Sequence, residues 1–303
     1  MAPPDKLRSL WPLWLIAAVG LCIAVIVIAT FHHPAKRLTG LLVDLELYGP
    51  DSRRYKDLRV AITEKIPAEV EFFRGYEIEL DYRHFSELGP ATETERTCDF
   101  VILSPQSTPW HMYKGTDGEG GPESAMAWLR NVVLNENLPV LGICGGHQFL
   151  AMAFGGRVDF IDPEYCGRFP EKYPREGISE RGQVVLTTLA DDPILKGVAS
   201  HPGRFRAVES HYEEVKTVPH PFVNLASSPL SPVQLIRMPG KAVYGTAFHP
   251  ERGWKAGRCE DGEGVPEGRR LLANFLNFVA DRSSNGSKRG GGAAHRVESK
   301  TSL

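Results

Sequence analysis

The 303-residue sequence predicts a three-layer α/β protein, in which a mostly parallel β-sheet has helices on both faces. A transmembrane helix is predicted to precede it. Apolar runs alternate with segments of helical spacing between Arg37 and Gly156, a pattern typical of parallel sheets. Ahead of them lies one long uncharged apolar run. We expect an N-terminal tail with a transmembrane helix (1–37, helix about 11–31), one globular domain (38–282) and a disordered tail (283–303).

The N-terminal apolar run, Trp11 to Phe31, has the length of a membrane span. At ~1.5 Å per residue it is about 31 Å long, close to the ~30 Å hydrocarbon core. Trp11 and Trp14 lie at one end, where indole rings favour the membrane interface. A cleaved signal peptide is the alternative, but its apolar run is normally only ~7–15 residues long and is followed by small residues. We therefore expect an uncleaved, single-pass anchor.

Each element of the globular domain follows from a local pattern. Continuous apolar runs or alternation of apolar and polar residues predict strands at 38–47, 75–82, 100–103 and 138–143. Helical spacing predicts helices at 51–66, 122–134 and 148–154. After Gly156 the pattern changes to short strand candidates, at 184–188, 205–209, 222–226, 233–237 and 242–248. A closing amphipathic helix is predicted at 271–280.

The composition excludes several classes of protein. Lys and Arg number 35 against 37 for Asp and Glu, so the chain lacks the basic excess of a nucleic-acid-binding protein. Five cysteines without a CxxC pair argue against a disulfide scaffold, a zinc finger or a c-type haem site. We expect no cofactor and no metal.

The most informative motif is Gly142-Ile143-Cys144-Gly145-Gly146-His147-Gln148, which follows an apolar strand and opens a helix. G-x-C-x-G is the thiol form of the nucleophile elbow. Its glycines permit a sharp turn in which Cys144 adopts an unfavourable backbone conformation. The helix N-terminus lowers the pKa of the thiol, and the N–H of Gly145 points to where an oxyanion would form. The alternative is a buried cysteine between glycines that pack a helix.

A second motif, Phe248-His249-Pro250-Glu251, follows an apolar strand near the end of the folded region. A thiol nucleophile needs a base, and the base needs an orienting partner. His249 fits the role of the base, and Glu251 can hold its imidazole. On its own, His-Pro-Glu is an ordinary loop, so the functional interpretation depends on both motifs together.

Together the two motifs resemble the class I, triad-type glutamine amidotransferase family, over roughly 41–279. Two further stretches match in order. Val101-Ile102-Leu103-Ser104 lies where the family has the strand before its Gly-rich loop, and Glu209-Ser210-His211-Tyr212 looks like the family's Ser-His segment. The resemblance implies a substrate, glutamine or a γ-glutamyl compound, and a γ-glutamyl thioester on the cysteine.

The resemblance also implies the role of each matching residue. Cys144 attacks the side-chain amide carbon of glutamine, and His249 transfers the proton to the leaving ammonia and then activates water. Glu251 orients His249, and Gly145 donates one N–H to the oxyanion hole. The residues implied to contact the substrate are Gln148, Ser210 and His211.

One loop departs from the family pattern. The family usually carries Gly-Gly-Pro after the serine, whereas this chain has Ser104-Pro105-Gln106-Ser107. By position Gln106 supplies the second oxyanion N–H, but its side chain disfavours a positive φ. Losing one oxyanion donor costs ~10²–10³ in rate, so the departure bears on efficiency or on substrate identity. The aromatic and imidazole side chains that follow either line a substrate pocket or are surface residues of the loop: Trp110, His111 and Tyr113.

Three functions remain open from the sequence. The first is a glutaminase subunit that delivers ammonia to a partner synthase, since no separate synthase segment is recognised in the chain. The second is a stand-alone γ-glutamyl hydrolase. The third is a catalytically weak, membrane-tethered binding module, which the intact triad disfavours and the altered loop favours.

The flanking charges barely decide the membrane orientation, because two basic residues lie close to each end of the apolar run: Lys6 and Arg8 before it, Lys36 and Arg37 after it. A reactive thiol survives best in a reducing compartment, and glutamine is an intracellular metabolite. We therefore expect the catalytic domain on the cytoplasmic side of the membrane.

Overall fold

The computed structural model describes residues 36–47, 52–90, 98–113, 121–164, 177–254 and 265–290. The predicted transmembrane helix at about 11–31 lies outside these ranges and stays a prediction. In the part of the chain that the structure does describe, none of the helices combines the length and the apolar character needed to cross a bilayer.

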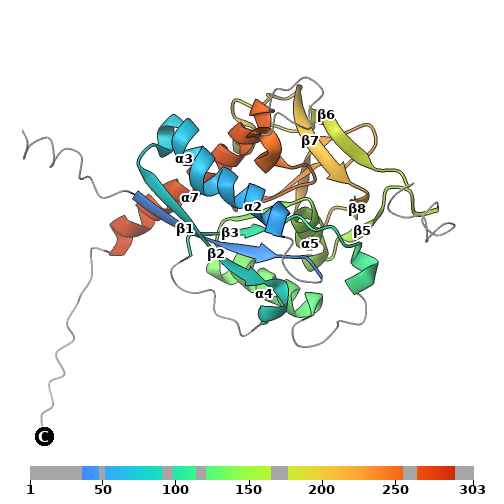
Figure 1. The fold of residues 1–303 in the computed structure, drawn as a ribbon, viewed down its shortest axis with the longest axis horizontal. Helices are drawn as coiled ribbons and strands as arrows, with labels where there is room; N and C mark the ends of the chain where they lie inside the picture. Colours follow the sequence, from blue (N-terminus) through green and yellow to red (C-terminus); the bar gives the residue numbers. More distant parts are fainter. Residues whose placement is uncertain are drawn as a thin grey trace, which may run out of the picture.

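A nine-stranded sheet forms the centre of the molecule, with the strand order β2-β1-β3-β4-β11-β10-β9-β6-β7 (Figure 1). Its first five strands are parallel to one another: β2 (Tyr76–His84), β1 (Lys36–Asp44), β3 (Phe100–Leu103), β4 (Val140–Ile143) and β11 (Val243–Thr246). The remaining four are antiparallel: β10 (Leu235–Met238), β9 (Val223–Ser227), β6 (Glu180–Thr188) and β7 (Arg204–His211). A separate antiparallel pair joins β5 (Arg157–Phe160) to β8 (Glu213–Thr217).

The prediction of a mostly parallel sheet is therefore correct for one half of the sheet and wrong for the other, and the sheet is mixed. Parallel neighbours need a long crossover, usually a helix, whereas antiparallel neighbours need only a turn. Residues 239–242 join β10 to β11, and Gly240 there has a φ of +77°, which glycine adopts readily. The connection from β9 to β10, residues 228–234, is likewise too short for a crossover helix.

Helices cover both faces of the parallel half, which confirms the three-layer prediction (Figure 1). One core contains Leu38 and Leu42 of β1, and the other contains Leu41 and Val43, because successive strand residues point to opposite faces. The first face packs against α2 (Ser52–Val60), α3 (Ile66–Glu69) and α7 (Pro266–Gly290). The second face packs against α4 (Pro122–Asn131) and α5 (Gly145–Ala153).

Shorter helical turns complete the framework. Two π-helical turns continue α2 and α4: η2 (Ala61–Lys65) and η6 (Val132–Glu136). Within the described residues, 3₁₀ turns lie in the connections at η3 (Glu71–Phe73), η4 (Phe85–Glu87), η5 (Trp110–Tyr113), η8 (Pro193–Leu195) and η9 (Pro250–Trp254).

The last helix corrects one predicted boundary. Helix α7 continues to Gly290, so the prediction of a disordered tail from residue 283 is wrong at its start. The hydroxyl of Ser284 donates to the carbonyl of Ala280 at 2.8 Å, a bond that spans one helical turn. Residues 291–303, the rest of the predicted tail, lie outside the described residues.

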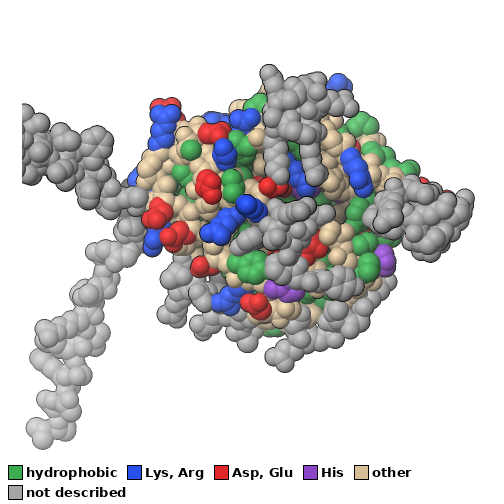
Figure 2. Space-filling model, in the orientation of Figure 1, with side chains coloured by type: hydrophobic (Ala, Val, Ile, Leu, Met, Phe, Trp, Pro, Cys, Tyr) green, Lys and Arg blue, Asp and Glu red, His purple; other side chains and the backbone are tan. Residues whose placement is uncertain are grey.

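The surface carries both signs of charge. On the face shown in Figure 2, Lys and Arg side chains are interspersed with Asp and Glu rather than gathered into a patch of one sign. This distribution agrees with the near-balanced composition of the chain.

Candidate active site

The nucleophile turn joins β4 to α5. Cys144 has φ 53° and ψ −103°, a positive φ that side chains rarely adopt, so the predicted backbone strain is confirmed. Glycines make the turn possible: a Cβ on Gly142 would lie 2.3 Å from the carbonyl oxygen of Gly146, and one on Gly146 would lie 2.3 Å from that of Leu103. The N–H of Cys144 donates to the carbonyl of Thr246 at 2.7 Å, which holds the turn on the neighbouring strand.

His249 and Glu251 follow β11 and form a buried pair. Nδ1 of His249 lies 2.7 Å from Oε1 of Glu251. Because an ionised carboxylate only accepts hydrogen bonds, Nδ1 carries a proton and Nε2 is left as the acceptor of a neutral ring. Nε2 is buried and has no hydrogen-bond partner among the described residues. Burial lowers the pKa of His249 below its ordinary value, although the Glu251 carboxylate opposes this effect, so the neutral ring is favoured.

Strand β7 contacts both Cys144 and His249, the residues predicted to be the nucleophile and the base. Sγ of Cys144 lies 4.0 Å from the carbonyl oxygen of Ser210, and the N–H of His249 donates to that of Val208 at 2.8 Å. Thr246, the last residue of β11, pairs with Ile143, the last residue of β4. The two strands therefore end side by side, shortly before His249 and Cys144. The structure thus brings both sequence motifs to the carboxyl ends of two neighbouring central strands, β4 and β11.

The two residues predicted to form the oxyanion hole are neighbours. A Cβ on Gly145 would lie 2.2 Å from Cγ of Gln106 and 2.9 Å from its backbone nitrogen. Among the described residues, the non-glycine residues with a positive φ are Asn137 and Cys144, so Gln106 does not need that conformation. The side chain of Gln106 covers Gly145, and its buried Oε1 has no hydrogen-bond partner among the described residues.

The residues predicted to contact substrate differ in their surroundings. Ser210 is adjacent to Cys144 through its carbonyl. Both ends of the Gln148 side-chain amide are engaged within the protein: Oε1 accepts from Nε1 of Trp110 at 2.7 Å, and Nε2 donates to the carbonyl of Glu213 at 2.6 Å. His211 is buried, with its ring against two carboxylates described below. Their roles toward a substrate stay predictions.

The segment before α4 is tied to the turn between β7 and β8. The N–H of Trp110 donates to the carboxylate of Glu213 at 3.2 and 3.3 Å, and the Tyr212 hydroxyl donates to the carbonyl of Ser107. Burial raises the pKa of Glu213 to about 8. Trp110 is half-buried and Tyr113 is buried, so the interpretation of these two as surface aromatics is wrong; His111 is exposed. Sequence reasoning missed Glu213, because acidic residues in a predicted loop give no signal of burial.

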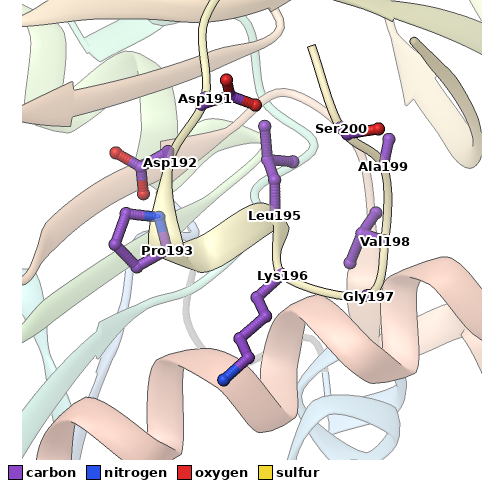
Figure 3. Close-up of a pocket in the computed structure, with 9 residues that line it drawn as sticks. All are labelled: Asp191, Asp192, Pro193, Leu195, Lys196, Gly197, Val198, Ala199 and Ser200. Carbon is purple, nitrogen blue, oxygen red and sulfur yellow. The ribbon is translucent and has the colours of Figure 1, made fainter.

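A pocket at 191–200, around η8, contains none of these residues (Figure 3). Its Asp192 has a structural role, since the carboxylate pairs with Arg237 and accepts from the Tyr244 hydroxyl at 3.1 Å. Lys196 extends from the same loop toward α7. The nucleophile motifs and this pocket therefore lie in different parts of the fold.

Comparison with known proteins supports the resemblance found in the sequence. The family model "Glutamine amidotransferase class-I" matches residues 81–259. A glutamine-hydrolyzing GMP synthase subunit of Methanosarcina barkeri is 35% identical over 204 residues, which cover 65% of this chain and 93% of the relative. The corresponding subunit of Methanococcus maripaludis is 36% identical over 139 residues, covering 46% of this chain and 64% of the relative. The chain thus aligns with somewhat less than two thirds of the Methanococcus maripaludis relative's length.

Solved structures show the same fold. A putative GMP synthase subunit from Thermoplasma acidophilum superimposes with a TM-score of 0.54 and 21% identity, covering 84% of this chain and all of that one. A glutamine amidotransferase from Thermotoga maritima gives a TM-score of 0.54 at 16% identity, covering 82% of this chain and all of that one. At these identities the likeness concerns the fold alone.

The contact between Gly145 and Gln106 generates a prediction. Gly145→Ala is expected to slow hydrolysis of the glutamine amide by about 10²-fold, because the added Cβ would force the two predicted oxyanion donors apart. The double variant Gly145→Ala/Gln106→Gly should recover part of this loss, since the 2.2 Å contact with Cγ disappears.

The measurement is steady-state ammonia release, with thermal unfolding of each variant to show that it folds. A Gly145→Ala protein as fast as the wild type, or a double variant no faster than the single one, would contradict the predicted oxyanion geometry.

Proposed function

Because the chain belongs to the class I glutamine amidotransferase family, we propose that it hydrolyses the side-chain amide of glutamine and delivers the ammonia to a partner synthase. The observation that supports this most directly is the position of the buried His249–Glu251 pair. It follows β11, and the strained Cys144 follows β4, the parallel strand beside it. A thiol on such a turn and a neutral imidazole with an accepting Nε2 are the two groups that covalent amide hydrolysis requires.

The reaction uses these groups in two steps. Nε2 of His249 accepts the thiol proton while Sγ of Cys144 attacks the amide carbon, and the backbone N–H groups of Gly145 and Gln106 stabilise the oxyanion. The imidazolium then gives its proton to the leaving nitrogen, which departs as ammonia and leaves a γ-glutamyl thioester. His249 next removes a proton from water, whose oxygen attacks the thioester, and glutamate and the free thiol are released. Glu251 keeps the Nδ1 proton in place throughout.

The names of the relatives support a partner that consumes the ammonia. They describe one subunit of a glutamine-hydrolysing GMP synthase, a designation that implies a second polypeptide. By analogy, the acceptor of this chain's ammonia is bound by another protein chain. A stand-alone γ-glutamyl hydrolase is the alternative, since the loop at Gln106 departs from the family pattern.

Ammonia release from the full chain tests the proposal. Free glutamine should be hydrolysed, faster in the presence of the co-purifying synthase, and Cys144→Ala should abolish the activity. Cys98→Ala is the matched control, because burial raises the pKa of the Cys98 thiol to about 11 and keeps it protonated. Turnover of γ-glutamyl amides without turnover of glutamine would replace the proposal by the hydrolase. Failure of an electrophilic glutamine analogue to label Cys144 would favour the binding module.

The pH dependence gives a second test, through Glu251→Gln. The Glu251 carboxylate raises the pKa of His249, so its removal should lower that pKa further. His249 acts as a base only when neutral; the acid limb of kcat/KM should therefore move to lower pH, while kcat falls by about 10²–10⁴-fold with the loss of orientation.

The control for this experiment is Glu77→Gln, which changes a half-exposed carboxylate on β2. It should leave the pH profile unchanged. An acid limb that stays in place or moves to higher pH in Glu251→Gln would show that Glu251 does not act on the catalytic base.

The proposal includes a location. The uncharged run from Trp11 to Phe31 would anchor the chain as a single span, with the catalytic domain on the cytoplasmic side. A reporter fused after Leu303 should then be active inside the cell, and deletion of 11–31 should release the protein from the membrane fraction. A reporter active only outside the cytoplasm would reverse the orientation.

A further inference from the structure

A buried charged cluster lies where β6 and β7 pair, next to the candidate active site. Glu180 begins β6 directly opposite His211, which ends β7. Nε2 of His211 lies 3.2 Å from a carboxylate oxygen of Glu180 and 3.2 Å from one of Glu209. The side chain of Glu180 is 5% exposed, that of Glu209 0% and that of His211 2%, so water does not screen these contacts.

The surroundings of the His211 ring determine its protonation. Nδ1 lies 3.1 Å from the carbonyl oxygen of Glu213, which can only accept a hydrogen bond. Nε2 faces the Glu180 carboxylate, which also accepts, so both ring nitrogens donate and the ring is an imidazolium. Burial lowers the pKa of His211, but the hydrogen bonds to Glu180 and Glu209 outweigh burial and raise it to about 10.

The cluster reaches charge balance through Glu209. Two ionised carboxylates and one imidazolium would leave a net negative charge in the interior, which is costly. Burial raises the pKa of Glu209, so this carboxyl group holds a proton more readily than an exposed one. Glu180 accepts a further hydrogen bond at 2.7 Å from Nε2 of Gln234. Two hydrogen-bond donors, His211 and Gln234, thus converge on Glu180, while burial favours the protonated form of Glu209.

Short links connect the cluster to both catalytic residues. Glu209 and His211 flank Ser210, whose carbonyl oxygen lies 4.0 Å from Sγ of Cys144. The preceding residue of β7, Val208, accepts the N–H of His249 at 2.8 Å. The strand that the cluster fixes is therefore the strand that touches the nucleophile and the base.

The positive ring also acts on its neighbours across space. Burial has the largest effect on the pKa of His249 and lowers it; Glu251 raises this pKa, and Arg252 and the His211 ring lower it further. On the other side His147 of α5 is fully buried; burial and His211 lower its pKa to about 3, so it stays neutral. The charged groups that bear on His249 therefore come from its own segment and from β7.

We propose that Glu180, Glu209 and His211 form an imidazolium clamp that fixes β7 against Cys144 and His249 and keeps the His249 ring in its neutral, proton-accepting form. The proposal rests on the hydrolytic function proposed above. In this role the three are positioning residues, acting through β7 and through charge rather than through the substrate contact that the family resemblance implies for His211. One oxygen or nitrogen from each of the three side chains lies within 4.8 Å of the other two. Binding of a divalent cation among them is therefore the alternative to a protonated His211 ring.

Nitrogen NMR of the histidine-labelled full chain tests the clamp without any activity. At about pH 8 both ring nitrogens of His211 should be protonated, well above the ordinary range for histidine, with the signal assigned by its loss in His211→Gln. A neutral His211 ring would overturn the proposal. So would a rise in the thermal midpoint on adding Zn²⁺ that Glu209→Gln abolishes, because the cluster would then be a metal site.

The effect on the base is measured by the pH dependence of Cys144 alkylation with iodoacetamide and of kcat/KM. In His211→Gln, and in Glu180→Gln/Glu209→Gln, the acid limb should move to higher pH, because a positive His211 ring no longer contributes to lowering the pKa of His249. Glu77→Gln on the surface is the matched control. Loss of rate or stability without this shift would reduce the cluster to a structural role and overturn the electrostatic part of the proposal.

The two proposals fail in different ways. If glutamine is not hydrolysed at all, the function is wrong, while the His211 ring state and the alkylation profile still report on the clamp. If His211→Gln does not fold, the alkylation profile of Glu180→Gln/Glu209→Gln decides the matter.

Discussion

The pairing of β4 with β11 is the constraint on which the candidate active site depends. Ile143 lies opposite Thr246, and the next residue, Cys144, donates its N–H to the Thr246 carbonyl at 2.7 Å. A shift of this register by one residue would turn every side chain of β11 to the opposite face of the sheet. His249, three residues beyond Thr246, would then point away from the nucleophile turn. One set of backbone hydrogen bonds therefore places two residues that are far apart in the sequence.

The family and the parallel half of the fold were predictable, because their signals are local. The turn around Cys144 and the segment after β11 each carry a compact motif, and the match to the class I glutamine amidotransferase family over 81–259 confirms the family prediction. In the antiparallel half, strands were predicted at 184–188, 205–209, 222–226 and 233–237, but their arrangement was not, since the sequence does not show which of them pair. Strands β5 and β8 were missed outright: Glu213–Thr217 contains one aliphatic residue, Val215.

The surroundings of the site were harder to predict than its central residues. Glu180, Glu209 and Glu213 are acidic residues that a sequence pattern assigns to the surface, yet all three are buried. Their burial depends on partners supplied by other elements: His211 for the first two and the N–H of Trp110 for the third. Such long-range pairings follow from the register of β6 with β7 and from the course of the loop before α4, neither of which leaves a periodic signal.

The backbone of Cys144 has a consequence for the whole molecule. A non-glycine residue held at φ 53° and ψ −103° costs about 1–3 kcal/mol, a sizeable part of the net stability of a typical domain. The close seating of α5 on β3 and β4, through Gly142 and Gly146, opposes relaxation of this turn. The fold therefore holds one residue in an unfavourable backbone conformation, and the packing around the turn keeps the Cys144 side chain in that position.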